Sequence, residues 1–315
     1  MLQSEIQSLV QIASMYYKEH LNQQDIADRM GITRQTVIKM LKKAEVEGIV
    51  EFKIHNPLEV LEEYSSRLAE RFNLRKAIVV PCKFKDQDMV TAALSQHGSK
   101  YILDLLDSGL KNVGLSWGRS VYRTIVNLPV AYYDDVNFFP LVGASSRTAE
   151  YFMINEIVRK AATTLNATPI YTYIPADPGS LEDINLFKRT SAYDTIANCW
   201  KNIDLAVMGV GVNPSLEQGI RDSYPSEQFT DNIAFKDAAG DMLPHYFDAN
   251  GQFITINDEH ILCAGIDDLK NAKRVLAIAG GVNKAAPIFA ALKTGIITDI
   301  VTDQNTCERL MKMRG

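Results

Sequence analysis

The stretch LNQQDIADRMGITRQTVIKMLKKAEVEGIV, residues 21–50, carries the strongest local signals in the chain. Asn22 is suited to accept hydrogen bonds at the start of a helix over QQDIADRM, and Gly31 is suited to end that helix in a left-handed conformation. Thr33 is suited to cap the next helix, RQTVIKMLKKAEVEG, which carries an apolar stripe and stops at Gly48. Two short helices joined by a tight, glycine-containing turn are typical of a helix-turn-helix.

The flanking residues extend this unit in both directions. Apolar residues recur at helical spacing over residues 3–19, which predicts a preceding helix. After the stretch, IVEFKIH (49–55) alternates apolar and polar residues and predicts a strand of a small β-wing. Residues 1–55 are therefore predicted to form a winged helix-turn-helix domain.

The charges of this domain favour contact with double-stranded DNA. The whole chain has a net charge of −5, which argues against indiscriminate coating of nucleic acid. Arginine and glutamine make bidentate hydrogen bonds to guanine and adenine, so the outward residues of the second helix are expected to contact bases. These are Arg34, Gln35 and Lys39. Phosphate contacts are expected from Gln24, Thr33, Thr36, Lys42 and Lys43. A small helical bundle with a solvated basic face is the alternative, and the turn glycine, the cap threonine and the wing weigh against it.

Residues 56–75 are predicted to form a connecting helix. Leu58, Leu61, Leu68 and Phe72 make an apolar stripe that is suited to pair with another copy of the chain. This segment is therefore interpreted as a linker and oligomerisation helix.

From residue 76 to residue 315 the pattern changes to alternating strands and helices. Short apolar strands such as KAIVVP, NVGLSWG, VNFFPLVG, DLAVMGVG, RVLAIAGG and DIVTD are separated by helical stretches. This alternation predicts an α/β domain with a parallel sheet covered by helices.

Composition limits the remaining possibilities. No apolar stretch approaches the roughly 20 residues of a membrane helix, and the N-terminus lacks the pattern of a secretory signal, so a cytoplasmic protein is expected. The four cysteines lie far apart and the five histidines form no ligand motif. No metal site or cofactor is therefore expected, and the cysteines are interpreted as packed thiols.

Four glycine-bearing turns follow predicted strands: GLSWGRS (114–120), LVGASSR (141–147), GVGVNPS (209–215) and AGGVNKA (279–285). Such turns gather at the carboxyl edge of a parallel sheet, where helix N-termini attract anions. Hydroxyls of Ser116, Ser120, Ser145 and Ser146 and the cations Arg119 and Lys284 favour a phosphate-bearing ligand. The alternative is that these glycines serve packing alone.

The combined segments resemble the SorC family of sugar-responsive regulators. The resemblance covers essentially the whole chain and rests on QQDIADRMGITRQTVIKMLKKAEVEGIV, VGLSWGRSV, FPLVGASSR, GDMLPHYFDANG and AGGVNKAAPI. It implies an effector domain that resembles sugar-phosphate isomerases but acts as a sensor. It further implies operator DNA and a sugar or sugar phosphate as partners, and a tetramer built from two dimers.

The resemblance also implies effector contacts turn by turn, at Gly118, Arg119, Ser120, Gly143, Ala144, Ser145, Gly209, Gly211, Val212, Asp241, Gly281 and Lys284. Ser116 is added for its hydroxyl. Asp241 is expected to accept hydrogen bonds from sugar hydroxyls, and Lys284 to meet the phosphate. Two departures from the family pattern are Ala144, where many members have glycine, and Pro244, which interrupts helices and is expected to affect the position of Asp241.

Other interpretations of the same residues stay open at this point. Arg119 is also suited to a surface ion pair and Asp241 to a helix cap, while Trp117 is expected in the core. His245 and Asp248 are expected to be an incidental pair, so no catalytic residue is assigned. A sugar-phosphate isomerase with a DNA-binding head and a DNA scaffold without a ligand are the competing functions.

Overall fold

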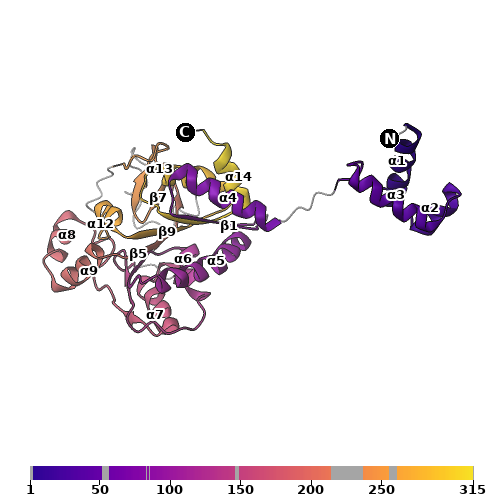
Figure 1. The fold of residues 1–315 in the computed structure, drawn as a ribbon. Coiled ribbons are helices and arrows are strands. Elements are labelled where there is room, and N and C mark those ends of the chain that lie inside the picture. Colours follow the sequence, from indigo (N-terminus) through magenta and orange to yellow (C-terminus); the bar gives the residue numbers. More distant parts are fainter. Residues whose placement is uncertain are drawn as a thin grey trace. The chain divides into compact units, whose positions relative to one another are not determined.

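The computed structural model describes residues 3–51, 57–82, 84, 86–145, 149–213, 237–254 and 261–314. The chain divides into two compact units, Met1–Pro57 and Leu58–Gly315 (Figure 1). No helix among the described residues is long and apolar enough to cross a membrane.

The N-terminal unit contains the three helices that the sequence predicts: α1 (Gln3–Tyr17), α2 (Gln23–Met30) and α3 (Arg34–Val46). Asn22 accepts hydrogen bonds from the backbone N of Gln24 and of Asp25, at 2.9 and 3.0 Å. These caps satisfy amide groups that a helix start leaves without partners.

The turn between α2 and α3 also has the predicted geometry. Gly31 has φ = 65°, and the Thr33 hydroxyl accepts from the backbone N of Thr36 at 3.2 Å. The predicted wing strand is not seen at residues 49–51, and residues 52–56 lie outside the described residues.

Helix α4 (Pro57–Phe72) belongs, from Leu58 on, to the second unit and packs into its core. Leu61 and Leu68 are buried in the core of that unit, and the Phe72 ring meets the Phe289 ring edge to face at 5.6 Å. The stripe interpreted above as a surface for another copy is thus largely used within the same chain. Leu61 and Leu68 are not available to a partner, which corrects that part of the interpretation.

The second unit is built on a seven-stranded sheet in the order β1-β10-β9-β5-β2-β3-β4, with every pair parallel. The strands are β1 (Lys76–Val80), β2 (Asn112–Leu115), β3 (Asn137–Pro140), β4 (Thr168–Pro169), β5 (Leu205–Met208), β9 (Arg274–Ile278) and β10 (Asp299–Asp303). After β2 the chain moves outward to β3 and β4, and then returns to place β5 on the other side of β2. The order of the strands therefore reverses between β2 and β5.

Helices cover both faces of this sheet (Figure 1). They are α5 (Gln87–Asp107), α6 (Arg119–Val126), α7 (Ile154–Leu165), α8 (Leu181–Phe187), α9 (Ser191–Lys201), α12 (Ile266–Asn271), α13 (Ala285–Lys293) and α14 (Gln304–Lys312), with single turns η1 (Glu150–Phe152) and η5 (Val282–Lys284). Successive residues of β9 enter different cores, Val275 and Ala277 on one face and Leu276 and Ile278 on the other. The parallel α/β sheet with both faces buried is confirmed.

A small antiparallel sheet, formed by β6 (Gly211–Val212), β7 (Gly240–Met242) and β8 (His245–Phe247), was not predicted. Pro244 does not interrupt a helix here, because it lies in the two-residue turn between β7 and β8. The preceding Leu243 has φ = 54°, a left-handed conformation that is costly for leucine. This hairpin places Asp241 opposite Gly211.

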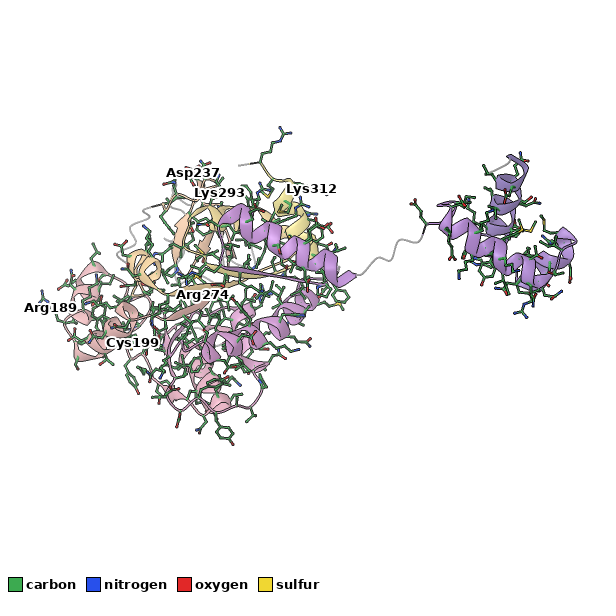
Figure 2. The ribbon with its side chains drawn as sticks, viewed as in Figure 1. Arg189, Cys199, Asp237, Arg274, Lys293 and Lys312 are labelled. Carbon is green, nitrogen blue, oxygen red and sulfur yellow. The ribbon has the colours of Figure 1, made fainter. Side chains whose placement is uncertain are left out.

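At the amino ends of the strands of the large sheet, an ion pair joins the first residues of β9 and β10. The Arg274 guanidinium makes two hydrogen bonds to the Asp299 carboxylate, with Nε donating to Oδ2 at 2.7 Å. Figure 2 labels Arg274 within the second unit. Asp299 also accepts from the Tyr101 hydroxyl at 2.7 Å and from the Thr298 hydroxyl at 2.6 Å. Asp299 is fully buried, so this network satisfies a charge that would otherwise be expensive to bury.

Candidate effector pocket and nucleic-acid interface

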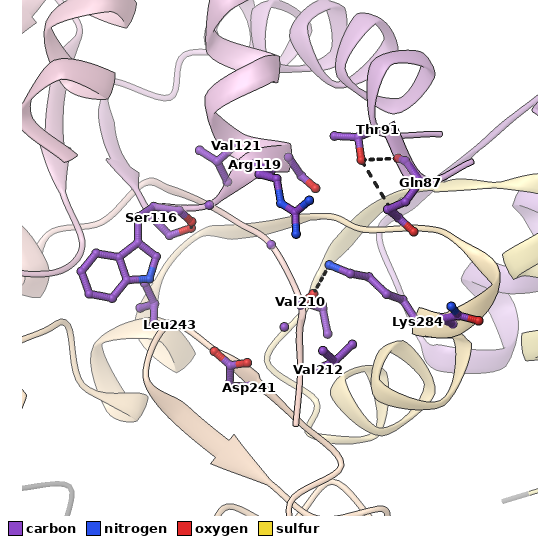
Figure 3. A pocket seen from close by; sticks show the side chains of 16 residues that line it. Gln87, Thr91, Ser116, Arg119, Val121, Val210, Val212, Asp241, Leu243 and Lys284 are labelled. Atoms are coloured by element: carbon purple, nitrogen blue, oxygen red, sulfur yellow. Dashed lines mark hydrogen bonds between the residues drawn. The ribbon is translucent and has the colours of Figure 1, made fainter. Parts of the chain in front are cut away.

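A pocket of about 370 Å³ opens at the carboxyl ends of β2 and β5, where the strand order reverses (Figure 3). Ligands of open α/β sheets bind at such a point. Its lining comes from the turns after β2, β5 and β9 and from the β6–β7–β8 sheet. The lining residues are Gln87, Thr91, Ser116, Trp117, Gly118, Arg119, Ser120, Val121, Gly209, Val210, Gly211, Val212, Asp241, Leu243, Asn283 and Lys284.

The turn after β2 presents a helix start to this pocket. Gly118 has φ = 120°, a conformation that side chains rarely adopt, and it precedes the first residue of α6. The first turn of an α-helix leaves amide groups without intrahelical partners, and its dipole favours anions. Arg119 is exposed and its guanidinium points into the pocket (Figure 3).

Lys284 approaches the same space from the turn after β9. Its ammonium donates to the Val210 carbonyl at 3.0 Å, so it bridges the turns after β9 and β5 (Figure 3). Arg119 and Lys284 therefore bring two positive charges to one pocket from different elements. Such a pair attracts an anionic ligand.

Asp241 supplies a buried carboxyl to the pocket. Its Oδ1 has no hydrogen-bond partner among the described residues. Burial raises the pKa of Asp241 to about 7, and the nearby Lys284 offsets part of this increase. Because Asp241 lies in strand β7, the alternative that it caps a helix is wrong. An unsatisfied buried acceptor is suited to a ligand that brings hydroxyl donors.

Nine of the thirteen predicted effector residues line this pocket: Ser116, Gly118, Arg119, Ser120, Gly209, Gly211, Val212, Asp241 and Lys284. The turn Gly143–Ser145 does not line it. The backbone N of Gly143 donates to the Leu262 carbonyl, and that of Ala144 donates to the Ile174 carbonyl, both at 2.8 Å. A β-carbon on Gly143 would lie 2.4 Å from the Pro175 carbonyl oxygen, so this glycine serves close packing. Ser146 lies outside the described residues.

Gly281 also lies outside the pocket lining. Its backbone N donates to Asp303 Oδ2 at 2.8 Å and to Thr306 Oγ1 at 2.9 Å, and both acceptors are buried. The amide predicted to bind the effector is therefore occupied by the protein. This glycine shapes the turn that carries Lys284.

Several pocket residues were missed or misplaced by the sequence interpretation. Trp117, expected in the core, is half-buried on the pocket wall and meets the Phe152 ring edge to face at 5.8 Å. Gln87 and Thr91 come from α5, which follows β1 at the same sheet edge. The carboxyl-edge rule used for the glycine turns would have found Gln87, but no glycine marks that connection.

His245 takes no part with Asp248, as expected. Its Nε2 is 2.8 Å from the Ala264 carbonyl oxygen, and burial lowers the pKa of its imidazole. The Asp248 carboxylate accepts instead from the backbone N of Asn250 and of Gln252. These contacts stabilise local turns.

The N-terminal unit presents a separate candidate surface, the outward face of α3. Arg34, Gln35, Lys39 and Lys42 are all exposed there. The other four predicted DNA contacts are engaged within the unit: Thr33 caps α3 and bonds to Thr36 through their hydroxyls, Gln24 donates to Asp28, and Lys43 pairs with Glu5. Arg34 is engaged as well, because its Nε donates to Gln23 Oε1 at 3.4 Å. The Glu5 carboxylate raises the pKa of Lys43.

Comparisons with known proteins agree with this architecture. Residues 56–312 match the family model described as "Putative sugar-binding domain". The chain is 29% identical to the sorbitol operon regulator of Klebsiella pneumoniae over 98% of both chains, and 27% identical to the deoxyribonucleoside regulator of Bacillus subtilis (strain 168) over 96% of both. The crystal structure of the full-length sorbitol operon regulator SorC from Klebsiella pneumoniae superposes with a TM-score of 0.74 and 27% identity, covering 98% of this chain and all of that one.

Proposed function

Because this chain belongs to the SorC family of sugar-responsive regulators, and matches its sugar-binding domain over residues 56–312, we infer that it is a sugar-responsive, DNA-binding transcription regulator. We further propose that it controls an operon for carbohydrate use. We propose that it acts in the cytoplasm, because operator binding requires access to the chromosome.

The effector is proposed to be a phosphorylated sugar. The observation that carries this proposal is the joint presence of two cations and a buried, unsatisfied carboxylate oxygen in one pocket. Arg119 and Lys284, together with the first turn of α6, are suited to a phosphate. Asp241 is suited to sugar hydroxyls, because its Oδ1 lacks a donor among the described residues.

The regulatory mechanism is proposed to be linkage between this pocket and the DNA-binding unit. A helix-turn-helix contacts a short half-site, so specific binding calls for at least a dimer, and the family resemblance supports a tetramer of two dimers. An effector that binds one packing of the sensor domains better than another changes DNA affinity by the coupling free energy, commonly about 1–3 kcal/mol.

Two variants test the division of labour between the two units. Arg34→Ala is expected to weaken binding to duplexes selected from a random DNA library, while binding of sugar phosphates to the pocket is unchanged. Lys284→Ala is expected to abolish the response to sugar phosphates with DNA binding retained. Equal damage to both functions by both variants would contradict the proposal. Turnover of a sugar phosphate by the wild-type chain would favour the competing isomerase function instead.

A further inference from the structure

Helix α3 carries a large apolar side chain on the face turned to solvent. Ile38 is 42% exposed, whereas Val37 and Leu41 of the same helix are 0% and 6% exposed and form the core of the unit. Ile38 is therefore not needed to hold α3 on the helices beneath it. Isoleucine is also a poor choice for a solvated helix position, because its branched β-carbon restricts its rotamers.

The neighbours of Ile38 on this face are the side chains expected to contact DNA. Residues three and four apart share a helix face, so Ile38 lies one turn beyond Gln35 and Arg34 and one turn before Lys42. All three neighbours are exposed and polar or cationic. Ile38 is thus an apolar side chain set among groups that are expected to contact bases and phosphates.

The major groove offers one apolar group on its base edges, the C5-methyl group of thymine. A side chain with no donor or acceptor recognises no other base feature by direct contact. We propose that Ile38 packs on a thymine methyl group and makes the chain prefer thymine over cytosine at one position of each half-site, next to the bases contacted by Arg34 and Gln35. This inference rests on the proposed DNA-binding function and adds a specificity-determining residue to it.

Removal of the methyl group from DNA tests the contact directly. Duplexes are first selected from a random-sequence library with the full chain, and each thymine of the selected site is then replaced singly by deoxyuracil. This replacement keeps the base pair and deletes only the methyl group. One thymine of a half-site is expected to lose about fourfold in affinity for the wild-type chain, the effect of one buried methyl group.

The same duplexes are then measured with two variants. Ile38→Ala is expected to bind the thymine and deoxyuracil forms equally, because the apolar partner is gone. Val46→Ala is the matched control, since Val46 is an apolar residue of the same helix with 78% exposure, beyond the expected base contacts. It is expected to keep the fourfold difference. Circular dichroism checks that both variants retain their helices.

The possible outcomes separate this inference from the function on which it rests. If no thymine is sensitive to loss of its methyl group, or if the sensitivity persists in Ile38→Ala, the inference is overturned while DNA binding stands. If no duplex is selected at all, the proposed function itself fails.

Discussion

Gly211 and Asp241 are paired across β6 and β7, and the carboxylate of Asp241 occupies the space that a side chain on residue 211 would need. A β-carbon on Gly211 would lie 1.9 Å from Asp241 Oδ1. The absence of a side chain at position 211 therefore fixes where the buried carboxyl of the pocket lies. Gly211 on β6 in this way sets the position of the Asp241 carboxyl on β7.

Substitution of this glycine is expected to damage the pocket through sterics. Gly211→Ala forces the carboxyl or the strand to move, and overpacking of this kind costs about 1–3 kcal/mol. We expect a lower melting temperature for the second unit and loss of sugar-phosphate binding, both followed by thermal unfolding of the full chain with and without ligand. Gly209→Ala is the matched control for stability alone, because a β-carbon there meets no atom within 4 Å although Gly209 also lines the pocket. Equal destabilisation by the two variants would contradict the steric argument.

The raised pKa of Asp241 predicts a pH dependence of stability. Burial raises this pKa to about 7 in the folded chain, against about 3.9 for an unfolded aspartate. Between these two values the folded chain binds more protons than the unfolded chain, so the contribution of Asp241 to stability is fully present below pH 4 and is lost as the pH rises to 7. Above pH 7 the charged carboxylate, buried without a partner for its Oδ1 among the described residues, lowers the stability of the folded chain.

Asp241→Asn removes this titration and keeps the shape of the side chain. We expect the variant to gain about 1–3 kcal/mol over the wild type above pH 7, and to lose that advantage on acidification. Chemical denaturation of the full chain at pH 5 and pH 8, followed through the transition of the second unit, measures the difference. A constant gap between the two proteins across this range would show that Asp241 does not titrate there.

The sequence predicted the large sheet and its helices because their patterns are local. Strand β9, for example, is one short apolar run, and in the N-terminal unit α3 likewise begins at its own cap residue, Thr33. The hairpin that carries Asp241 escaped prediction because its strands are three residues long and its turn contains Pro244 and a left-handed Leu243. Neither residue is a usual hairpin signal.

The glycine turns show where local pattern is insufficient. Gly118 and Gly143 follow neighbouring strands in similar motifs, yet only Gly118 lines the pocket. Occupancy of the glycine amide does not explain the difference, because the backbone N of Gly118 itself donates to the Tyr151 carbonyl at 2.8 Å. The difference arises because segments remote in sequence, around Ile174 and Leu262, bond to the turn at Gly143 and Ala144. Likewise, Asp303 and Thr306 take up the amide of Gly281. Which amides remain for a ligand depends on these tertiary partners, and one sequence does not contain that information.

The Arg274–Asp299 ion pair, at the amino ends of β9 and β10, is expected to contribute strongly to stability. Among the described residues, Arg274→Met leaves the fully buried Asp299 with the hydroxyls of Tyr101 and Thr298 as its remaining side-chain donors, and breaking such a pair costs about 3–5 kcal/mol. Lys273→Met is the matched control. Lys273 pairs with Asp204 at 2.7 Å and is 65% exposed, and the Asp204 carboxylate, only 11% exposed, keeps the backbone N of Lys111 and of Asn112 as donors, so loss of the lysine should cost less than about 1 kcal/mol. Urea unfolding gives the free energy of unfolding of the two variants. If both variants lose a similar amount relative to the wild type, the Arg274–Asp299 pair has no special structural role.

Adjacent lysines on α3 are expected to differ in their effect on DNA binding. Lys42 is exposed without a described ion-pair partner, whereas Lys43 pairs with Glu5. A lysine that neutralises a phosphate releases a counterion, so its loss lowers the slope of log affinity against log salt by about 1. We expect this change in slope for Lys42→Ala and a clearly smaller one for Lys43→Ala, because the Lys43 ammonium is already paired with the Glu5 carboxylate.

A change to the partner of Lys43 should act in the opposite direction. Glu5→Gln removes the carboxylate that holds the ammonium, which leaves Lys43 available to a phosphate and makes the salt dependence steeper by up to about 1. Titrations of a selected duplex at several salt concentrations give the slope for each variant. If Lys42→Ala and Lys43→Ala lower it equally and Glu5→Gln leaves it unchanged, then the Lys43–Glu5 pair yields to DNA, and Lys43 contacts phosphate as the sequence first indicated.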